Sequence, residues 1–192
     1  MKVLEAIYGR RATRDFAGKP VGRDLITHLI EAAIQAPSAI NEQPWRFTVI
    51  GERTILDRIS QDSKSYALSN AAEHRLPQRL LDRLNDPAFH IFYNAPVLIL
   101  ISAVSNSTWA VEDCALAAEN LMLAAHADGL GTCWIGFAQS WLQTPDAKKL
   151  LGLANECRPI APIIVGYPLT VPAPPSRHRP EVRWIGMPAA LP

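Results

Sequence analysis

The sequence predicts a single domain, spanning residues 1–192, in which helices cover a central β-sheet. The length suits one domain with a sizeable hydrophobic core. A continuous apolar run at 96–104 is typical of a strand buried on both faces of a sheet. An Ala-rich helix at 113–128 is apolar almost all round, so it has to be buried on most of its sides. A proline-rich, non-helical tail is expected from about residue 168.

The N-terminal half should contain several helices and one strand. An apolar stripe at 3–7 predicts a short helix that stops near Gly9. Apolar residues at three- and four-residue steps predict a second helix at 24–34, which ends before a proline. The segment 45–50 is predicted to be a strand, and helical spacing with high charge predicts one or two surface helices between 54 and about 84.

The C-terminal half should add two more strands and a helix. Strands are predicted at 131–136 and at 160–167, with a helical stretch around 146–153 between them. The Ala-rich helix at 113–128 packs either against a copy of itself in a dimer or in the core of a monomer. Composition leaves both arrangements open.

Charge and polarity exclude two classes of partner. The formal net charge is +1, so there is no global positive field that would attract nucleic acid. The Ala-rich helix contains Glu119, Asn120 and His126, which interrupt it too often for a membrane span. Neither a nucleic-acid partner nor a membrane partner is expected.

Cysteine usage and the first residues bear on redox state and location. The three cysteines are an odd number at wide spacing, without the pattern of a zinc site. We therefore expect reduced, buried thiols of an intracellular protein rather than metal ligands or a disulfide: Cys114, Cys133 and Cys157. Residues 1–6 lack the apolar run of a signal peptide, so a cytoplasmic location is expected.

Two clusters of arginine indicate a bound anion. Arg10, Arg11 and Arg14 lie within five residues, and such a cluster repels itself unless an anion neutralises it. Phosphate is the anion that arginine forks fit best. Arg177 and Arg179 form a second basic cluster in the tail. The alternative interpretation treats these arginines as the solvated face of an interaction module.

The segment 36–45 is a polar loop that prolines interrupt twice, between a predicted helix and a predicted strand. Its backbone groups are free to meet a ligand. Together with the first arginine cluster, it points to a binding site for a phosphate-bearing cofactor.

Four motifs in order resemble those of the nitroreductase-like flavoproteins. They are R-R-x-x-R at 10–14, A-P-S-x-x-N-x-Q-P-W at 36–45, an Ala-rich helix running into G-L-G-T-C-W-I-G at 129–136, and G-Y-P at 166–168 followed by R-x-R. The resemblance covers residues 4 to about 185. It implies an α+β fold with a central, mostly antiparallel sheet flanked by helices, in an intertwined homodimer that binds flavin mononucleotide (FMN) at each end of the interface.

The resemblance also implies roles for individual residues. Arg10, Arg11, Ala12 and Arg14 match the first cofactor-binding segment, in which Arg10 would hold the phosphate with Arg177 and Arg179, and Arg14 would sit at the pyrimidine edge of the ring. The partner subunit would contribute Pro37, Ser38, Ala39 and Asn41. The turn whose backbone N–H reaches the flavin N5 matches Trp134, Ile135 and Gly136. No catalytic side chain and no metal ligand is expected.

The implied activity is that of an FMN-dependent oxidoreductase. It would pass electrons from NADH or NADPH, by ping-pong hydride transfer, to a small oxidised acceptor such as a nitroaromatic or a quinone. The alternative is an FMN-binding protein of the same fold with little turnover, acting in flavin storage, degradation or regulation. The chain departs from the family pattern at Ala12, where many relatives have Ser, and at Asn94, where Gly is more usual; residues 60–92 show no match that identifies a substrate.

Overall fold

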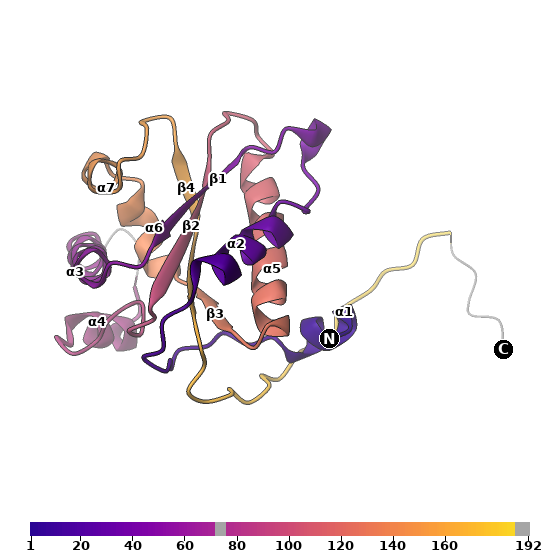
Figure 1. Ribbon diagram of the computed structural model, residues 1–192, viewed down its shortest axis with the longest axis horizontal. Helices are drawn as coiled ribbons and strands as arrows, with labels where there is room; N and C mark the ends of the chain where they lie inside the picture. Colours follow the sequence, from indigo (N-terminus) through magenta and orange to yellow (C-terminus); the bar gives the residue numbers. More distant parts are fainter. Residues whose placement is uncertain (72–75, 187–192) are drawn as a thin grey trace.

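A computed structural model describes residues 1–71 and 76–186 (Figure 1). At its centre is a sheet in the order β1-β2-β4-β3, in which every neighbouring pair is antiparallel. The strands are β1 (Trp45–Ile50), β2 (Val97–Ala103), β3 (Gly131–Trp134) and β4 (Arg158–Gly166). The helices on both sides of this sheet confirm the α+β prediction.

Strand β2 connects two hydrophobic cores, one on each face of the sheet. All of its residues are buried, as the apolar run predicts. Ile99 and Ile101 pack into the core on one face, whereas Leu98 and Leu100 pack into the core on the other. The alternation follows from the two-residue period of a strand.

Helices cover both faces of the sheet (Figure 1). On one face α5 packs against α2 and the sheet, with α1 beside α5, and on the other face α3 packs against α6, with α4 and α7 adjacent. The helices are α1 (Val3–Gly9), α2 (Arg23–Ala33), α3 (Arg53–Ser69), α4 (Gln78–Asn85), α5 (Ala110–Ala127), α6 (Gly136–Leu142) and α7 (Pro145–Leu151). The predicted surface helices correspond to α3 and α4; residues 72–75 of that stretch lie outside the described residues.

The prediction of a strand through residue 136 is wrong at its end, and helix α6 was not predicted. Ile135 still donates its N–H to the Pro162 carbonyl at 2.8 Å, but Ala138 then donates to the Ile135 carbonyl. The chain therefore turns from strand to helix within two residues, without the proline or polar loop that usually marks such a boundary.

Helix α5 is a core helix that also has an exposed side. Its Ala and Leu side chains pack against the sheet and α2, yet Val111 is 40% exposed and Leu116 is 46% exposed. The apolar stripe of α1 is exposed as well, with Ile7 at 50% and Tyr8 at 73%. The face that carries α1 and α5 thus leaves apolar side chains uncovered in the single chain.

The described part of the tail, residues 169–186, forms neither helix nor strand, and it extends away from the domain past α1 (Figure 1). The absence of helix agrees with the prediction for this segment. In the described residues, none of the helices is long and apolar enough to cross a membrane.

The three cysteines are buried and free, as predicted. Burial, with a smaller contribution from Asp113, raises the pKa of Cys114 to about 12. Burial also raises the pKa of Cys133. Both thiols therefore stay protonated and unreactive at neutral pH.

Candidate functional site

The arginine segment at 10–14 lies along β3, an outer strand of the sheet. Ala12 pairs with Thr132 in a parallel bridge, and the Thr13 N–H donates to the Thr132 carbonyl at 2.9 Å. A Cβ on Gly131 would come within 2.5 to 2.7 Å of three side-chain atoms of the buried Thr13. Only glycine at this position lets the two segments approach so closely.

The three arginines of this segment have different partners. Arg11 donates from Nη1 to the carbonyls of Tyr8 and Arg10, at 2.7 and 2.8 Å, so its guanidinium supports the backbone. The Nε of Arg10 lies 3.7 Å from Glu119 Oε1, a long contact to a half-exposed carboxylate. Arg14 is exposed, with its Cζ 6.0 Å from the centroid of the Tyr93 ring. Arg10 and Arg14 are therefore the cations that remain able to bind an anion.

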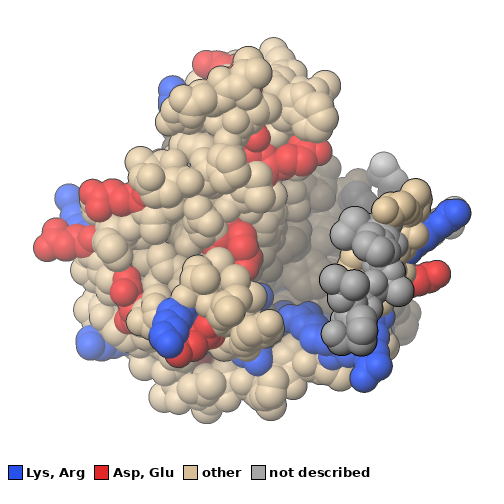
Figure 2. All heavy atoms as spheres, turned by 90° about the vertical axis from the view of Figure 1, so that its right-hand side faces the viewer, with Lys and Arg blue, Asp and Glu red and all other residues tan. Residues whose placement is uncertain are grey.

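A cavity of about 180 Å³ lies beside this segment. Its lining includes Arg10, Thr132 and His126, together with Val171 from the start of the tail. Burial and the charges of Arg10 and Arg11 lower the pKa of His126, so its ring is neutral at neutral pH. Figure 2, which views the face carrying α1 and α5, shows a hollow on this face with Lys and Arg side chains gathered below it.

The predicted loop is a compact structure that contains the short 3-10 helix η1 (Ala39–Asn41). The Ser38 Oγ accepts a hydrogen bond from the Gln43 N–H at 3.0 Å, and the Asn41 Oδ1 accepts one from Gln43 Nε2 at 3.1 Å. The Ala39 N–H donates to Asp113 Oδ1 on α5 at 3.1 Å. Ile40 is 97% exposed.

The loop and the arginine segment lie at opposite ends of α5 (Figure 1). The loop is attached at Asp113, near the start of the helix. Gly9, next to the arginines, packs against the ring of His126, near the helix end. Thirteen residues of helix separate Asp113 from His126, about 20 Å along the axis. One chain therefore does not bring the two predicted parts of the site together.

The turn after β3 leaves the backbone N–H of Gly136 without a hydrogen bond among the described residues. The Ile135 N–H is already bonded to the Pro162 carbonyl. Gly136 opens α6, where an N–H has no partner within the helix. Gly136 is exposed, and no atom lies within 4 Å of where its Cβ would be. Trp134 is partly buried against the core. Of the three predicted residues, Gly136 is the one that faces open space.

The structure does not place the second arginine cluster beside the first. Arg177 and Arg179 are exposed residues of the tail, which extends away from the domain (Figure 1). The tail passes the arginine segment at Val171 before it leaves the domain.

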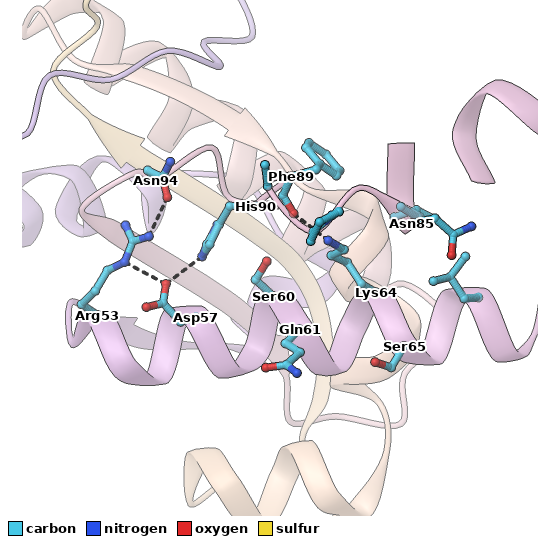
Figure 3. Close-up of a pocket in the computed structure, with 14 residues that line it drawn as sticks. Arg53, Asp57, Ser60, Gln61, Lys64, Ser65, Asn85, Phe89, His90 and Asn94 are labelled. Carbon is cyan, nitrogen blue, oxygen red and sulfur yellow. Dashed lines mark hydrogen bonds and ion pairs between the residues drawn. The ribbon is translucent and has the colours of Figure 1, made fainter. Parts of the chain in front are cut away.

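A larger groove, of about 580 Å³, lies along α3 (Figure 3). His90 Nε2 lies 3.0 Å from Asp57 Oδ1, and its Nδ1 accepts the Phe92 N–H at 3.1 Å. Arg53 binds the same Asp57 oxygen at 2.8 Å and Asn94 Oδ1 at 2.6 Å. These groups are partners of one another, so the cluster attaches the loop before β2 to α3 and is structural.

Asp113 was not predicted from the sequence, although a signal for it exists. The residue lies three positions after Ala110 and four before Ala117, on the stripe of α5 that packs into the core. A carboxylate on a buried apolar stripe needs a hydrogen-bond or ion-pair partner, because charged groups are rarely buried without one. The partner, Ala39, is distant in the sequence and could not be identified from the pattern.

The family model for the nitroreductase family matches residues 7–167. The chain belongs to the nitroreductase family. The match confirms the resemblance on which the predicted fold rests.

Individual relatives agree with this assignment. A provisionally named NADH dehydrogenase/NAD(P)H nitroreductase of Methanothermobacter thermautotrophicus is 30% identical over 177 residues, which cover 90% of this chain and 80% of that protein. The nitrobenzene nitroreductase of Ectopseudomonas oleovorans is 28% identical over 200 residues, with 85% of each protein covered. A nitroreductase of Bacteroides fragilis, crystallised with bound FMN, has a TM-score of 0.78 at 25% identity and covers 100% of this chain and 99% of its own.

Proposed function

We propose that the chain is an FMN-dependent oxidoreductase that passes electrons from NADH or NADPH to a small oxidised acceptor such as a nitroaromatic or a quinone. We further propose that two copies of the chain build each active site together. Membership of the nitroreductase family supports the reaction class, and the names of the relatives support the nicotinamide donor.

The proposal of a shared site rests on the distance between its two predicted parts. The arginine segment and the loop at 37–43 lie at opposite ends of α5, about 20 Å apart along its axis. A cofactor that meets both must therefore take one part from each of two chains. The exposed apolar side chains of α1 and α5, such as Ile7 and Leu116, give the two chains a surface on which to meet.

The phosphate of FMN fits the arginine segment. Arg10 has only a long contact to a half-exposed carboxylate, so a phosphate can compete for its guanidinium. Arg177 and Arg179 would complete the phosphate site from the tail. Each charge-assisted contact contributes about 1.5–3 kcal/mol before the desolvation of the ions is subtracted.

The flavin ring would lie over Gly136, with the loop of the partner subunit on its other side. The acceptor atoms of Ser38 and Asn41 are used inside the loop. The Ser38 hydroxyl hydrogen and the Asn41 amide hydrogens remain as donors, which suit the carbonyl oxygens of the ring.

Bound FMN supplies the hydride chemistry, so the protein contributes binding and electrostatics. Arg14 would place a fixed positive charge at the pyrimidine edge, where it would favour negative charge on the ring. The Gly136 N–H would be directed at the N5 position. Because the nicotinamide and the acceptor would use the same face of the ring in turn, parallel lines are expected in double-reciprocal plots of the initial rate.

Titration of the apoprotein with FMN and with riboflavin tests the proposed phosphate site. The Arg10→Ala substitution should raise the Kd for FMN by about 10- to 100-fold, the equivalent of about 1.5–3 kcal/mol. The Kd for riboflavin, which lacks the phosphate, should stay unchanged. The control is Arg23→Ala, which removes an exposed arginine at the start of α2. Equal FMN affinities in the two variants would contradict the assignment of Arg10.

A further inference from the structure

We propose that Asp113 is a positioning residue for the cofactor, because its buried carboxylate fixes the loop at 37–43 in the place from which Ser38 and Asn41 meet the FMN of the other subunit. The inference rests on the proposed function, which assigns the loop to that contact. Asp113 itself would not touch the cofactor.

The first observation is the contact itself. Asp113 is 4% exposed, on the buried side of the first turn of α5. Its Oδ1 accepts the Ala39 N–H at 3.1 Å, across 74 residues of sequence. A second link joins Glu42 to Ser105, but both residues of that hydrogen bond are near the surface. Asp113 therefore provides the buried attachment of the loop to the domain.

The second observation is the backbone of the loop. Ile40, Asn41 and Gln43 have φ angles of 49°, 59° and 50°, in the left-handed region that residues with side chains rarely adopt. For a β-branched residue such as Ile40 this region is strained, and it persists only where the surroundings fix it. The hydrogen bonds of Gln43 fix the shape of the loop, and Asp113 fixes where that shape is placed.

The third observation is that Asp113 is a poor choice for stability alone. Its Oδ2 is buried and has no hydrogen-bond partner among the described residues. A buried carboxylate oxygen without a partner costs free energy, which offsets part of what the hydrogen bond of Oδ1 and the place of the acid in the first turn of α5 contribute. The carboxylate is explained by the loop that it attaches rather than by the packing of α5.

Two variants of Asp113 and one control separate positioning from stability. Asp113→Ala removes the acceptor, whereas Asp113→Asn keeps an amide oxygen that can accept the Ala39 N–H. Glu112→Ala removes the neighbouring exposed acid from the same helical turn. For each variant, the Kd for FMN, the visible circular dichroism of bound FMN and the thermal unfolding of the apoprotein would be measured.

We expect Asp113→Ala to raise the Kd for FMN about tenfold or more and to change the visible circular dichroism. The unfolding temperature of its apoprotein should fall by no more than about 2–4 °C, the equivalent of one lost hydrogen bond. Asp113→Asn should stay within about threefold of the wild-type Kd, because the hydrogen bond is retained. Glu112→Ala should match the wild type in all three measurements.

The possible failures are distinguishable. If the wild-type chain binds no FMN, the proposed function fails and this inference fails with it. If the wild type binds FMN and Asp113→Ala binds it with equal affinity and an unchanged spectrum, only the positioning role is overturned. A parallel loss of thermal stability and FMN affinity in both Asp113 variants would show a structural role and would also overturn it.

Discussion

At the scale of the residue, the absence of a side chain at Gly131 allows the arginine segment to pack closely against β3. It allows Thr13 to lie against β3, and Thr13 carries the hydrogen bond that fixes the arginine segment. Asn94 shows a related effect, since its φ of 56° is one that Asn tolerates better than most residues. This backbone angle accounts for Asn94 at a position where Gly is more usual in the family.

Replacement of Gly131 by Ala should separate the arginine segment from β3. The new Cβ would overlap three atoms of Thr13, and overpacking of this kind costs about 1–3 kcal/mol of the free energy of unfolding. The affinity for FMN should fall as well, because Arg10 and Arg14 would move. Denaturant unfolding and FMN titration measure the two effects.

The matched control is Gly18→Ala, at an exposed position where an added Cβ meets nothing within 4 Å. This variant should keep both stability and FMN affinity. If Gly131→Ala behaves in the same way as Gly18→Ala, the close approach to Thr13 does not position the arginines.

At the same scale, contiguous motifs could be predicted and distant contacts could not. Arg10 and Arg14 belong to one short segment, so the role proposed for both could be inferred from the sequence. The link between Asp113 and Ala39 exists only after folding. That Arg11 donates to two backbone carbonyls is likewise a property of the folded segment.

At the scale of the element, hydrophobic periodicity predicted most helices and strands. The apolar run of β2 and the stripe of α2 are strong signals because each follows from which side chains are buried. Helix α6 was missed because it is short and follows β3 directly. The cluster on α3 was missed because its charged residues resemble a solvated surface until the loop at 86–95 packs over them.

The cluster on α3 makes stability depend on pH. Burial and the nearby Arg53 lower the pKa of His90 below its usual 6.5, in spite of its bond to Asp57. The unfolded chain therefore binds a proton at His90 more readily than the folded chain does, and the free energy of unfolding should fall as the pH drops below about 6.5.

His90→Gln tests this prediction, because the new side chain does not titrate. Between pH 7 and pH 5 the wild type should lose more of its free energy of unfolding than this variant does. His178→Gln, in the exposed tail, is the control and should follow the wild type. Denaturant unfolding at several pH values measures the difference, and identical profiles for wild type and His90→Gln would rule out the assigned role of His90.

At the scale of the whole molecule, the main feature is the apolar face formed by α1 and α5, which no described residue of a single chain covers. Ile7, Tyr8 and Leu116 are at least 46% exposed on helices that lie side by side. The sequence left open whether α5 packs in a core or in a dimer, and the structure shows a core helix with an exposed side. The motifs predicted the fold and the cofactor class. They did not predict which acceptor is reduced, because two chains would build the pocket that selects it.

A charge on α1 should break the proposed dimer. Ile7→Glu would place a carboxylate in an apolar interface, and we expect the dimer Kd to rise by at least about 100-fold, the equivalent of about 3 kcal/mol. FMN affinity should fall in step, because each proposed site would need both chains. Sedimentation equilibrium and FMN titration measure the two quantities.

Gln61→Glu is the control for this variant. It adds the same charge to an exposed position on α3, on the opposite side of the sheet. The dimer and the FMN affinity should be retained. A dimer that survives Ile7→Glu, or FMN binding by a monomer, would contradict the shared site.

The visible absorption spectrum during anaerobic addition of NADH or NADPH tests the central claim most directly. We expect the FMN-loaded protein to lose its yellow colour and to recover it when a nitroaromatic or a quinone is added. Colour that persists through the addition of both nicotinamides would contradict the oxidoreductase and would favour a flavin-binding protein with little turnover.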